Sequence, residues 1–470
     1  MKKISILLVI FIIISCKSTH VPKAGFAFQQ NTFSSDSNET KIYIVDTKPI
    51  DSIDVNKMIY DIFRVDYSKY PDSIKLYARP YDSLGNFVTQ MAYPYKTSKI
   101  EYFTSLDERL GKVYNVRDTN IKEFFVREFG KGDSIAFNIM LTIDYSGSIS
   151  QIIDIVREGT ELFVSLKYPY DKIGINSFND KFDVKVPLKA DMDEIIQEYR
   201  SKSGQNMGLF SAFFDAAYNS IELFRNTDSL TPRILVLFSD GDDNYSKVEY
   251  NEVIKLAQEL GVNIFTIAFG YSIDENLEML SKYTGGKSYK AYSKEELLAV
   301  FRDIYNSLRN YYLISYHPPK YWGYHKVFSE LTLPGRDSVM ISEAEYNTGV
   351  ITPWTDLSDM FSRPIMFEFD KAEIMPQSSQ ILDEITDAMM IIPNLRLEIQ
   401  GHTDNKGTQE YNLRLSNERA KAVYDGLVER GIEPRRLRYR GFGMNRPIAP
   451  NDSEENMAKN RRTEFVIIAK

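Results

Sequence analysis

The sequence predicts a multidomain α/β protein, in which a doubly wound domain is flanked by β-sandwich segments and followed by a C-terminal α+β domain. Three observations support this fold class. The 470 residues are too many for one compact core, since a domain holds roughly 150 residues. Strand-like and helix-like patterns alternate over residues 134–310, as a doubly wound sheet requires. A separate mixed pattern fills residues 363–470.

The composition argues against a disordered chain, a nucleic-acid-binding protein and an intramolecular disulfide bond. With 43% hydrophobic and 26% charged residues, the chain resembles folded domains rather than a disordered polymer. The formal net charge is -8, so there is no basic excess to neutralise phosphates, and we expect no nucleic acid partner. A single cysteine excludes an intramolecular disulfide bond.

The N-terminus has the form of a secretory signal peptide. Two lysines precede an apolar run over residues 4–14, which is too short to span a bilayer. The only cysteine of the chain, Cys16, follows this run after one serine. The arrangement resembles the lipobox of bacterial lipoproteins, which implies a signal peptide over residues 1–15 and lipidation of Cys16. The alternative is an ordinary signal peptide that contains a cysteine.

Changes in residue pattern predict the remaining domain boundaries. Residues 16–40 are polar and indicate a flexible tether. Residues 41–133 contain short strand-like runs, and residues 311–346 have the same character. Both segments need a cover for their apolar faces, and we therefore predict that they pair into one small β-sandwich around the inserted domain. Residues 347–362 are expected to form a linker.

The inserted domain, residues 134–310, contains apolar runs that predict parallel strands buried on both faces. These runs are rich in β-branched residues and cover residues 136–143, 172–178, 234–238 and 262–269. Helical patterns separate them, over residues 148–164, 210–224, 248–260 and 294–308.

Polar side chains directly follow two of these strands. Asp144, Ser146 and Ser148 come after the first strand, and Asp240 comes after a second. Because the carboxyl ends of parallel strands meet at one edge of the sheet, we expect these side chains to lie close together. Their hard oxygen atoms suit Mg²⁺. The alternative is that they only cap helices and order turns.

These two segments resemble the metal-ion-dependent adhesion site of the von Willebrand factor type A domain. The resemblance implies a Rossmann-like fold and a binding module. In this module a carboxylate of a protein partner completes the coordination of the metal, and the sequence does not identify that partner. It also implies Ser146 and Ser148 as direct ligands, with Asp144 and Asp240 acting largely through water.

One ligand of that family is missing from the sequence. The family supplies a threonine before the helix that corresponds here to residues 209–217, and this chain has Met207 at that place. Ser203, Asn206 and Ser211 are the neighbouring residues that can replace it, and the sequence does not choose among them. Binding of Mg²⁺ is therefore left open at this point.

Four ordered motifs characterise the C-terminal domain. They are Phe-Glu-Phe-Asp-Lys-Ala at residues 367–372, Gly-His-Thr-Asp-Asn-Lys-Gly at 401–407, Asn-Leu-Arg-Leu-Ser-Asn-Glu-Arg-Ala at 412–420 and Asn-Arg-Arg at 460–462. Together they resemble the OmpA-like peptidoglycan-binding family. Strands are expected over residues 365–369, 395–400, 436–441 and 464–469, with helices over residues 378–391 and 413–429.

The resemblance implies a site for the diaminopimelate of peptidoglycan. Asp404 would bind the ammonium group of this side chain, and Arg419 would bind its carboxylate in a bidentate manner. Further residues expected at this site are Thr403, Asn405, Asn412, Leu415, Asn460 and Arg461. The alternative is that Asp404 and Arg419 form only a surface salt bridge with each other, worth about 0–1 kcal/mol.

No set of residues in the sequence predicts catalysis. The four histidines lie in separate segments without metal-ligand spacing, and no phosphate-binding loop is present. We therefore expect a lipid-anchored protein of the outer membrane that faces the periplasm, binds peptidoglycan and presents a module for protein binding. A surface adhesin is the main alternative. A metal-dependent hydrolase is a third hypothesis, for which catalytic groups are lacking.

Overall fold

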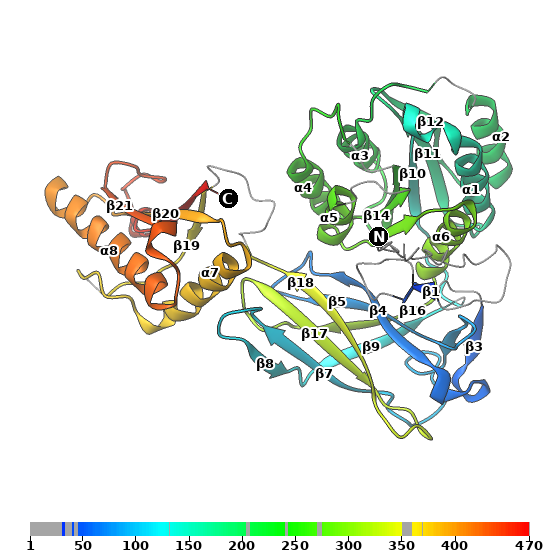
Figure 1. Cartoon of the computed structure of the whole chain (residues 1–470), viewed down its shortest axis with the longest axis horizontal. Helices are drawn as coiled ribbons and strands as arrows, with labels where there is room; N and C mark the ends of the chain where they lie inside the picture. The colour runs from blue at the N-terminus through cyan, green and yellow to red at the C-terminus, as the bar shows by residue number, and fades with distance from the viewer. Residues whose placement is uncertain are drawn as a thin grey trace, which may run out of the picture.

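A computed structural model shows three folded units, which are a β-sandwich, an α/β unit above it and a C-terminal unit beside it (Figure 1). It describes residues 31–32, 40–41, 46–130, 132–203, 207–239, 243–269, 275–349, 360–368 and 370–469. The expected signal peptide, Cys16 and Asp240 lie outside these residues. Within them, no helix is both long enough and apolar enough to cross a membrane. Of the expected tether, the structure describes a short antiparallel pair, β1 (Asn31–Thr32) with β2 (Thr40–Lys41).

The β-sandwich is built from the chain before and after the inserted domain. One sheet has the strand order β3-β6-β5-β16-β9, with β4 also paired to β5, and the other has the order β18-β17-β7-β8. The strands before the insertion are β3 (Thr47–Pro49), β4 (Ile59–Asp66), β5 (Ile74–Tyr81), β6 (Phe87–Thr89), β7 (Phe103–Leu110), β8 (Arg117–Asn120) and β9 (Phe124–Phe129). The strands after it are β16 (Tyr311–Tyr316), β17 (Tyr324–Leu331) and β18 (Met340–Asn347).

Strand β16 joins the two flanks of the insertion. It lies between β5 and β9 and is antiparallel to both, with Leu313 opposite Tyr77 on one side and Arg127 on the other. The predicted pairing of the two β-rich segments is therefore confirmed. Alternate residues of each strand fill the space between the sheets, among them Leu76 and Val327, which are fully buried.

The inserted domain is a doubly wound sheet with the strand order β12-β11-β10-β13-β14-β15. All neighbouring strands are parallel except β12, which is antiparallel to β11. The strands are β10 (Asn138–Asp144), β11 (Lys172–Phe178), β12 (Phe182–Lys189), β13 (Arg233–Ser239), β14 (Val262–Phe269) and β15 (Ser288–Ala291). The helices are α1 (Ile153–Ser165), α2 (Met192–Lys202), α3 (Phe213–Glu222), α4 (Tyr250–Leu260), α5 (Glu275–Tyr283) and α6 (Lys294–Ser307).

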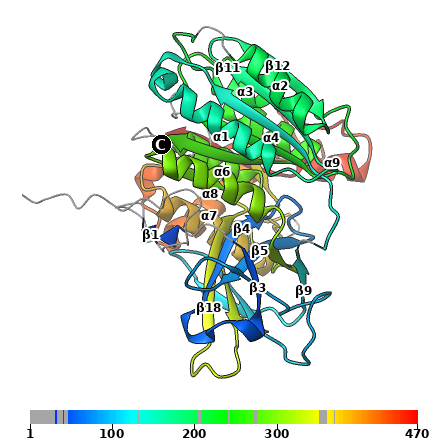
Figure 2. The ribbon, with the colours of Figure 1, turned by 90° about the vertical axis from the view of Figure 1, so that its right-hand side faces the viewer.

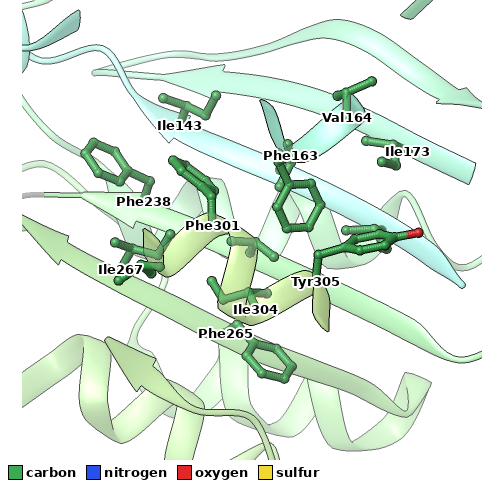
Figure 3. Close-up of a cluster of buried hydrophobic side chains, with 14 of the residues drawn as sticks. Ile143, Phe163, Val164, Ile173, Phe238, Phe265, Ile267, Phe301, Ile304 and Tyr305 are labelled. Carbon is green, nitrogen blue, oxygen red and sulfur yellow. The ribbon is translucent and has the colours of Figure 1, made fainter. Parts of the chain in front are cut away.

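Helices cover both faces of this sheet, which explains why its central strands β10 and β13 are buried along their whole length. Helices α1, α2 and α6 pack on one face, and α3, α4 and α5 pack on the other. Figure 3 shows Phe163 of α1 beside Phe301 of α6, in the same cluster as the sheet residues Ile143 and Ile267. The four predicted strands and four predicted helices are present, whereas β12, β15, α2 and α5 were not predicted.

The inserted domain lies above the sandwich in both views (Figures 1 and 2), and two buried arginines secure it, one to the sandwich and one within the domain itself. Arg79 of β5 donates to Asp303 of α6 at 3.1 Å, and both side chains are almost fully buried. Arg309, at the exit of the domain, pairs with Asp171 and donates to the backbone carbonyl of Ile135 at the entry. The entry and the exit of the insertion are therefore held together.

The C-terminal domain has a sheet of order β19-β22-β20-β21, against which two long helices pack. Its strands are β19 (Met360–Arg363), β20 (Arg396–His402), β21 (Leu437–Gly443) and β22 (Thr463–Ala469). Its helices are α7 (Ser379–Ile391), α8 (Gln409–Glu429) and the short α9 (Glu454–Asn460).

The first strand of this domain was predicted in the wrong place. It was expected over residues 365–369, but the sheet strand is β19, whose first three residues lie in the expected linker. Pro364 follows β19 and cannot donate to a ladder. The chain then turns back, and Phe367 forms only an isolated bridge with Ile374.

The Arg79–Asp303 pair predicts a large effect on stability. Replacing Asp303 by alanine leaves the guanidinium of Arg79 buried without this partner, and we expect the free energy of unfolding to fall by about 3–5 kcal/mol. Urea unfolding followed by circular dichroism measures the change. As a control, Asp118→Ala removes an exposed ion pair with Arg109 and is expected to cost about 0–1 kcal/mol. Equal losses in the two variants would contradict the prediction.

Candidate functional site

Asp404 lies in the loop between β20 and α8, and two groups of the chain hold its carboxylate. Its Oδ1 accepts from the backbone N–H of Lys406 at 2.9 Å, and its Oδ2 accepts from Arg461 Nη1 at 2.7 Å. The residue is only 6% exposed. A carboxylate has about four acceptor positions, so acceptor capacity for a further cation remains.

Arg419 lies on α8 and is held in place without an ion pair. Its Nε donates to the backbone carbonyl of Lys371 at 3.0 Å, and its guanidinium lies 5.0 Å from the ring centre of Phe367. Within the described residues, no carboxylate pairs with it and its two Nη groups form no hydrogen bond. Burial lowers the pKa of Arg419, and the nearby Tyr411 and Asp370 act to raise it.

Strands β20 and β21 pack closely against α8, the helix that carries Arg419. A Cβ atom on Gly401 would lie 2.2 Å from the carbonyl oxygen of Ser416, and one on Gly441 would lie 2.3 Å from the backbone nitrogen of Asn417. Only glycine permits this approach. The Oγ of Ser416 also accepts from the backbone N–H of Gly443 at 2.9 Å.

The other expected residues of this site divide into two groups. Thr403 and Asn412 both donate to the carbonyl of Asp404, at 3.0 Å and 3.4 Å, Leu415 is buried beneath the helix, and Asn405 is exposed in the loop. Thr403 and Asn412 therefore shape the loop, Leu415 lies beside it and Asn405 lies within it.

Asn460 and Arg461 are engaged with the chain itself. Asn460 is fully buried, and its side chain accepts from two backbone N–H groups of residues 448–449 and donates within residues 449–451. Arg461 binds Asp404 through one Nη group and Glu454 through the other. Arg461 therefore positions Asp404. The surface salt bridge alternative required Arg419 as the partner of Asp404, but the partner is Arg461.

His402 has a packing role beside this site. It is 2% exposed, and its ring stacks on Phe442 at 5.5 Å. Burial and the nearby guanidinium of Arg462 lower its pKa to about 4, so the ring is neutral at pH 7. The contacts of Lys371 and Phe367 with Arg419, and of Glu454 with Arg461, were not expected from the sequence, because no spacing rule connects these residues to Asp404 or Arg419.

The candidate metal site lies at the carboxyl edge of the sheet in the inserted domain. Asp144 ends β10 and is fully buried. Its Oδ2 accepts from Ser239 Oγ at 2.8 Å and from Ser211 Oγ at 2.9 Å, and its Oδ1 accepts from the backbone N–H of Ser146 at 2.7 Å. Burial raises the pKa of Asp144 to about 6, against the lowering effect of these hydrogen bonds. A cation bound at this edge of the sheet would favour the ionised form of Asp144.

Ser211, and not Met207, supplies a hydroxyl that donates to Asp144. Met207 packs against the apolar core, while the neighbouring backbone forms a bridge between Gly208 and Ser146. Ser203 follows α2, and its hydroxyl donates to the carbonyl of Arg200 at 3.3 Å. Asn206 and Asp240 lie outside the described residues, as does the side chain of Ser148.

The groups at this edge fit a hard cation with few charged ligands. In the part of the chain that is described, no three His, Cys, Asp or Glu side chains converge on a point that could hold a metal. Asp144 contributes the one described carboxylate, surrounded by hydroxyl groups of Ser146, Ser211 and Ser239. Such a set suits Mg²⁺, which keeps several waters when it binds to proteins.

Comparison with known proteins identifies two domain families. The von Willebrand factor type A family matches residues 138–304, and the OmpA family matches residues 366–461. The peptidoglycan-binding protein ArfA of Mycobacterium tuberculosis is 41% identical over 104 residues, which are 22% of this chain and 32% of that protein.

Two further relatives match the same C-terminal region. The peptidoglycan-associated lipoprotein of Pseudomonas putida is 38% identical over 99 residues, 21% of this chain and 59% of that protein. The crystal structure of the peptidoglycan-associated lipoprotein from Burkholderia pseudomallei has 32% identity and a TM-score of 0.21, covering 22% of this chain and 87% of that one. The match thus spans about a third to three fifths of these curated relatives. The chain carries a von Willebrand factor type A domain and a C-terminal OmpA-family domain.

Proposed function

We propose that this protein binds peptidoglycan through Asp404 and Arg419 of its OmpA-family domain. The observation that carries the proposal is the state of these two side chains. Asp404 is fixed by Arg461 with acceptor capacity left, and Arg419 is fixed through Nε while its Nη groups bind no described residue. The names of relatives that match this domain, a peptidoglycan-binding protein and peptidoglycan-associated lipoproteins, support the same function.

Diaminopimelate suits this pair because one side chain carries both an ammonium and a carboxylate. The ammonium would bind Asp404, and the carboxylate would bind the two Nη groups of Arg419. Both protein groups are partly removed from water, which strengthens charge-assisted hydrogen bonds. Thr403 and Asn412 would keep the loop in shape, and Asn405 lies exposed where it could contact the glycan or peptide.

The chain is further proposed to be a lipoprotein of the outer membrane whose folded domains face the periplasm. The lipobox-like cysteine supports the anchor, because several acyl chains hold a protein to a membrane more durably than one. Peptidoglycan lies inside the outer membrane, and this position favours a periplasmic scaffold over a surface adhesin. The two families identified are associated with binding, and we propose no catalytic activity.

The type A domain is proposed to bind a protein partner, with Mg²⁺ held at the edge that contains Asp144. Ser146, Ser148 and Ser211 would be its hydroxyl ligands, and Asp144 and Asp240 would act behind them. A bound Mg²⁺ would offer an open position to a carboxylate of the partner. The residues of this chain hold the ion and orient the loops around it.

Sedimentation with purified sacculi tests the wall-binding function. We expect the chain to pellet with sacculi that contain diaminopimelate, and we expect Asp404→Asn and Arg419→Ala to weaken binding at least tenfold, which is about 1.4 kcal/mol. Asp425→Asn and Arg414→Ala are matched controls, because both residues lie on α8 in exposed intrahelical ion pairs. A chain that stays in the supernatant, or variants that pellet like the controls, would disprove the assignment.

Thermal unfolding with and without Mg²⁺ tests the metal site. A ligand at 100 times its dissociation constant stabilises the folded state by about 2.7 kcal/mol, which raises the melting temperature of the type A domain. We expect this rise to be lost in Asp144→Asn and reduced in Ser211→Ala. Ser201→Ala, whose hydroxyl only bonds the carbonyl of Glu198 on α2, should retain it. The absence of any rise in the unaltered chain, against EDTA, would rule out a Mg²⁺ site.

Metabolic labelling tests the lipid anchor. Cells that express the chain are grown with an alkyne-bearing fatty acid, and we expect label on the unaltered protein and none on Cys16→Ser. The same variant should leave the outer-membrane fraction for the soluble fraction of the cell envelope. Equal labelling of the two proteins would refute lipidation at this residue.

A further inference from the structure

A buried carboxylate of α7 lies at the contact between the C-terminal domain and the sandwich. Asp387 of α7 is 1% exposed, and its oxygens accept from the backbone N–H groups of Lys112, Val113 and Tyr114 at 2.6–3.1 Å. These three residues belong to the loop between β7 and β8, in the other domain. Successive N–H groups that point at one anion form an anion-binding nest.

The nest is formed by the fold of the loop and not by Asp387 alone. Gly111, at its start, has φ of +80° and donates its N–H to the carbonyl of Tyr324 on β17. Asn115, at its end, has φ of +48°. The left-handed residues on both sides bend the backbone so that the intervening N–H groups face the same way, toward α7.

Further polar contacts surround this point along one face of α7. Asn115 donates to Asp383 at 2.7 Å, and Arg117 donates to Gln380 at 3.2 Å. Gln380 also donates to the carbonyl of Lys320 at 2.7 Å. Positions 380, 383 and 387 recur every three or four residues, so they share the face of the helix that meets the sandwich.

The junction depends on these polar contacts, since apolar packing around them is incomplete. A pocket remains beside the nest, lined in part by Trp322 and Tyr324 of the sandwich and by Ile385 and Ala388 of α7. The same kind of contact is used inside the sandwich, where Glu128 accepts from the backbone N–H groups of residues 90–92. The junction between the domains is therefore built like a contact within one domain.

We propose that this nest locks the C-terminal domain to the sandwich, so that the type A domain, the sandwich and the C-terminal domain form one rigid body. The type A domain is fixed to the opposite sheet by the Arg79–Asp303 pair and by Arg64, which donates to Asn263 at 2.7 Å. Neither Asp404 nor Arg419 takes part in the contact at the nest. The candidate ligand site at these two residues and the edge with Asp144 are thereby held in a constant relative orientation.

Distances between spin labels in the full chain test the proposal. Cysteines are introduced at the exposed residues Lys122 of the sandwich and Glu429 of α8, in a Cys16→Ser background. We expect one narrow distance distribution. Asp387→Ala removes the acceptor while alanine favours the helix, and we expect the narrow distribution to be lost. Asp425→Ala, which breaks only an ion pair on α8, is the matched control and should keep it.

A second variant acts from the other side of the junction. Asn115→Ala combined with Arg117→Ala removes two contacts of the sandwich with α7, and we expect it to broaden the distribution as well. Circular dichroism and sacculus sedimentation of each variant establish that its domains are folded. A broad distribution in the unaltered chain, or a narrow one in folded Asp387→Ala, would overturn the proposal.

Discussion

The antiparallel pairing of β9 with β16 is the constraint on which the rest of the structure depends. The type A domain occupies the chain between these strands, yet Phe129 and Tyr311, at its two ends, are direct partners in one ladder. A doubly wound fold whose ends lie close together meets this requirement, and Arg309 secures them by binding Asp171 and the carbonyl of Ile135. A folded inserted domain therefore keeps β9 and β16 close enough to pair.

Buried carboxylates perform a related task at other points of the molecule. Asp303 holds Arg79 between the type A domain and the sandwich, Asp387 holds a loop between the sandwich and the C-terminal domain, and Asp404 is held by Arg461 in the candidate ligand site. Each of these three carboxylates is matched by a cation or by backbone N–H groups, because an unmatched buried charge would cost several kcal/mol, on the order of 3–5. The candidate ligand site differs in one respect, since Arg419 keeps groups that no described residue uses.

Much of this organisation could be predicted from residue patterns. The apolar runs of β11 and β14 gave their bounds, because strands buried on both faces differ sharply from their surroundings. The strand β19 could not be located, since its residues Met360–Arg363 are mixed in character and pairing with β22 decides their structure. In the candidate sites, the motifs led to Asp404, Arg419 and Asp144. Two features could not be predicted: Ser211 supplies the hydroxyl that was expected at the position of Met207, and Arg461 and Lys371 have supporting roles. Both depend on contacts between distant segments that no local pattern encodes.

Calorimetric titration of the chain with two soluble stem peptides tests the central claim most directly. One peptide contains diaminopimelate, and the other has lysine in its place, which keeps the ammonium and lacks the second carboxylate. If Asp404 binds the ammonium and Arg419 the carboxylate, the first peptide binds at least about tenfold more tightly, and Arg419→Ala binds both peptides equally. Equal affinity of the unaltered chain for the two peptides, or a preference that survives in Arg419→Ala, would contradict the account.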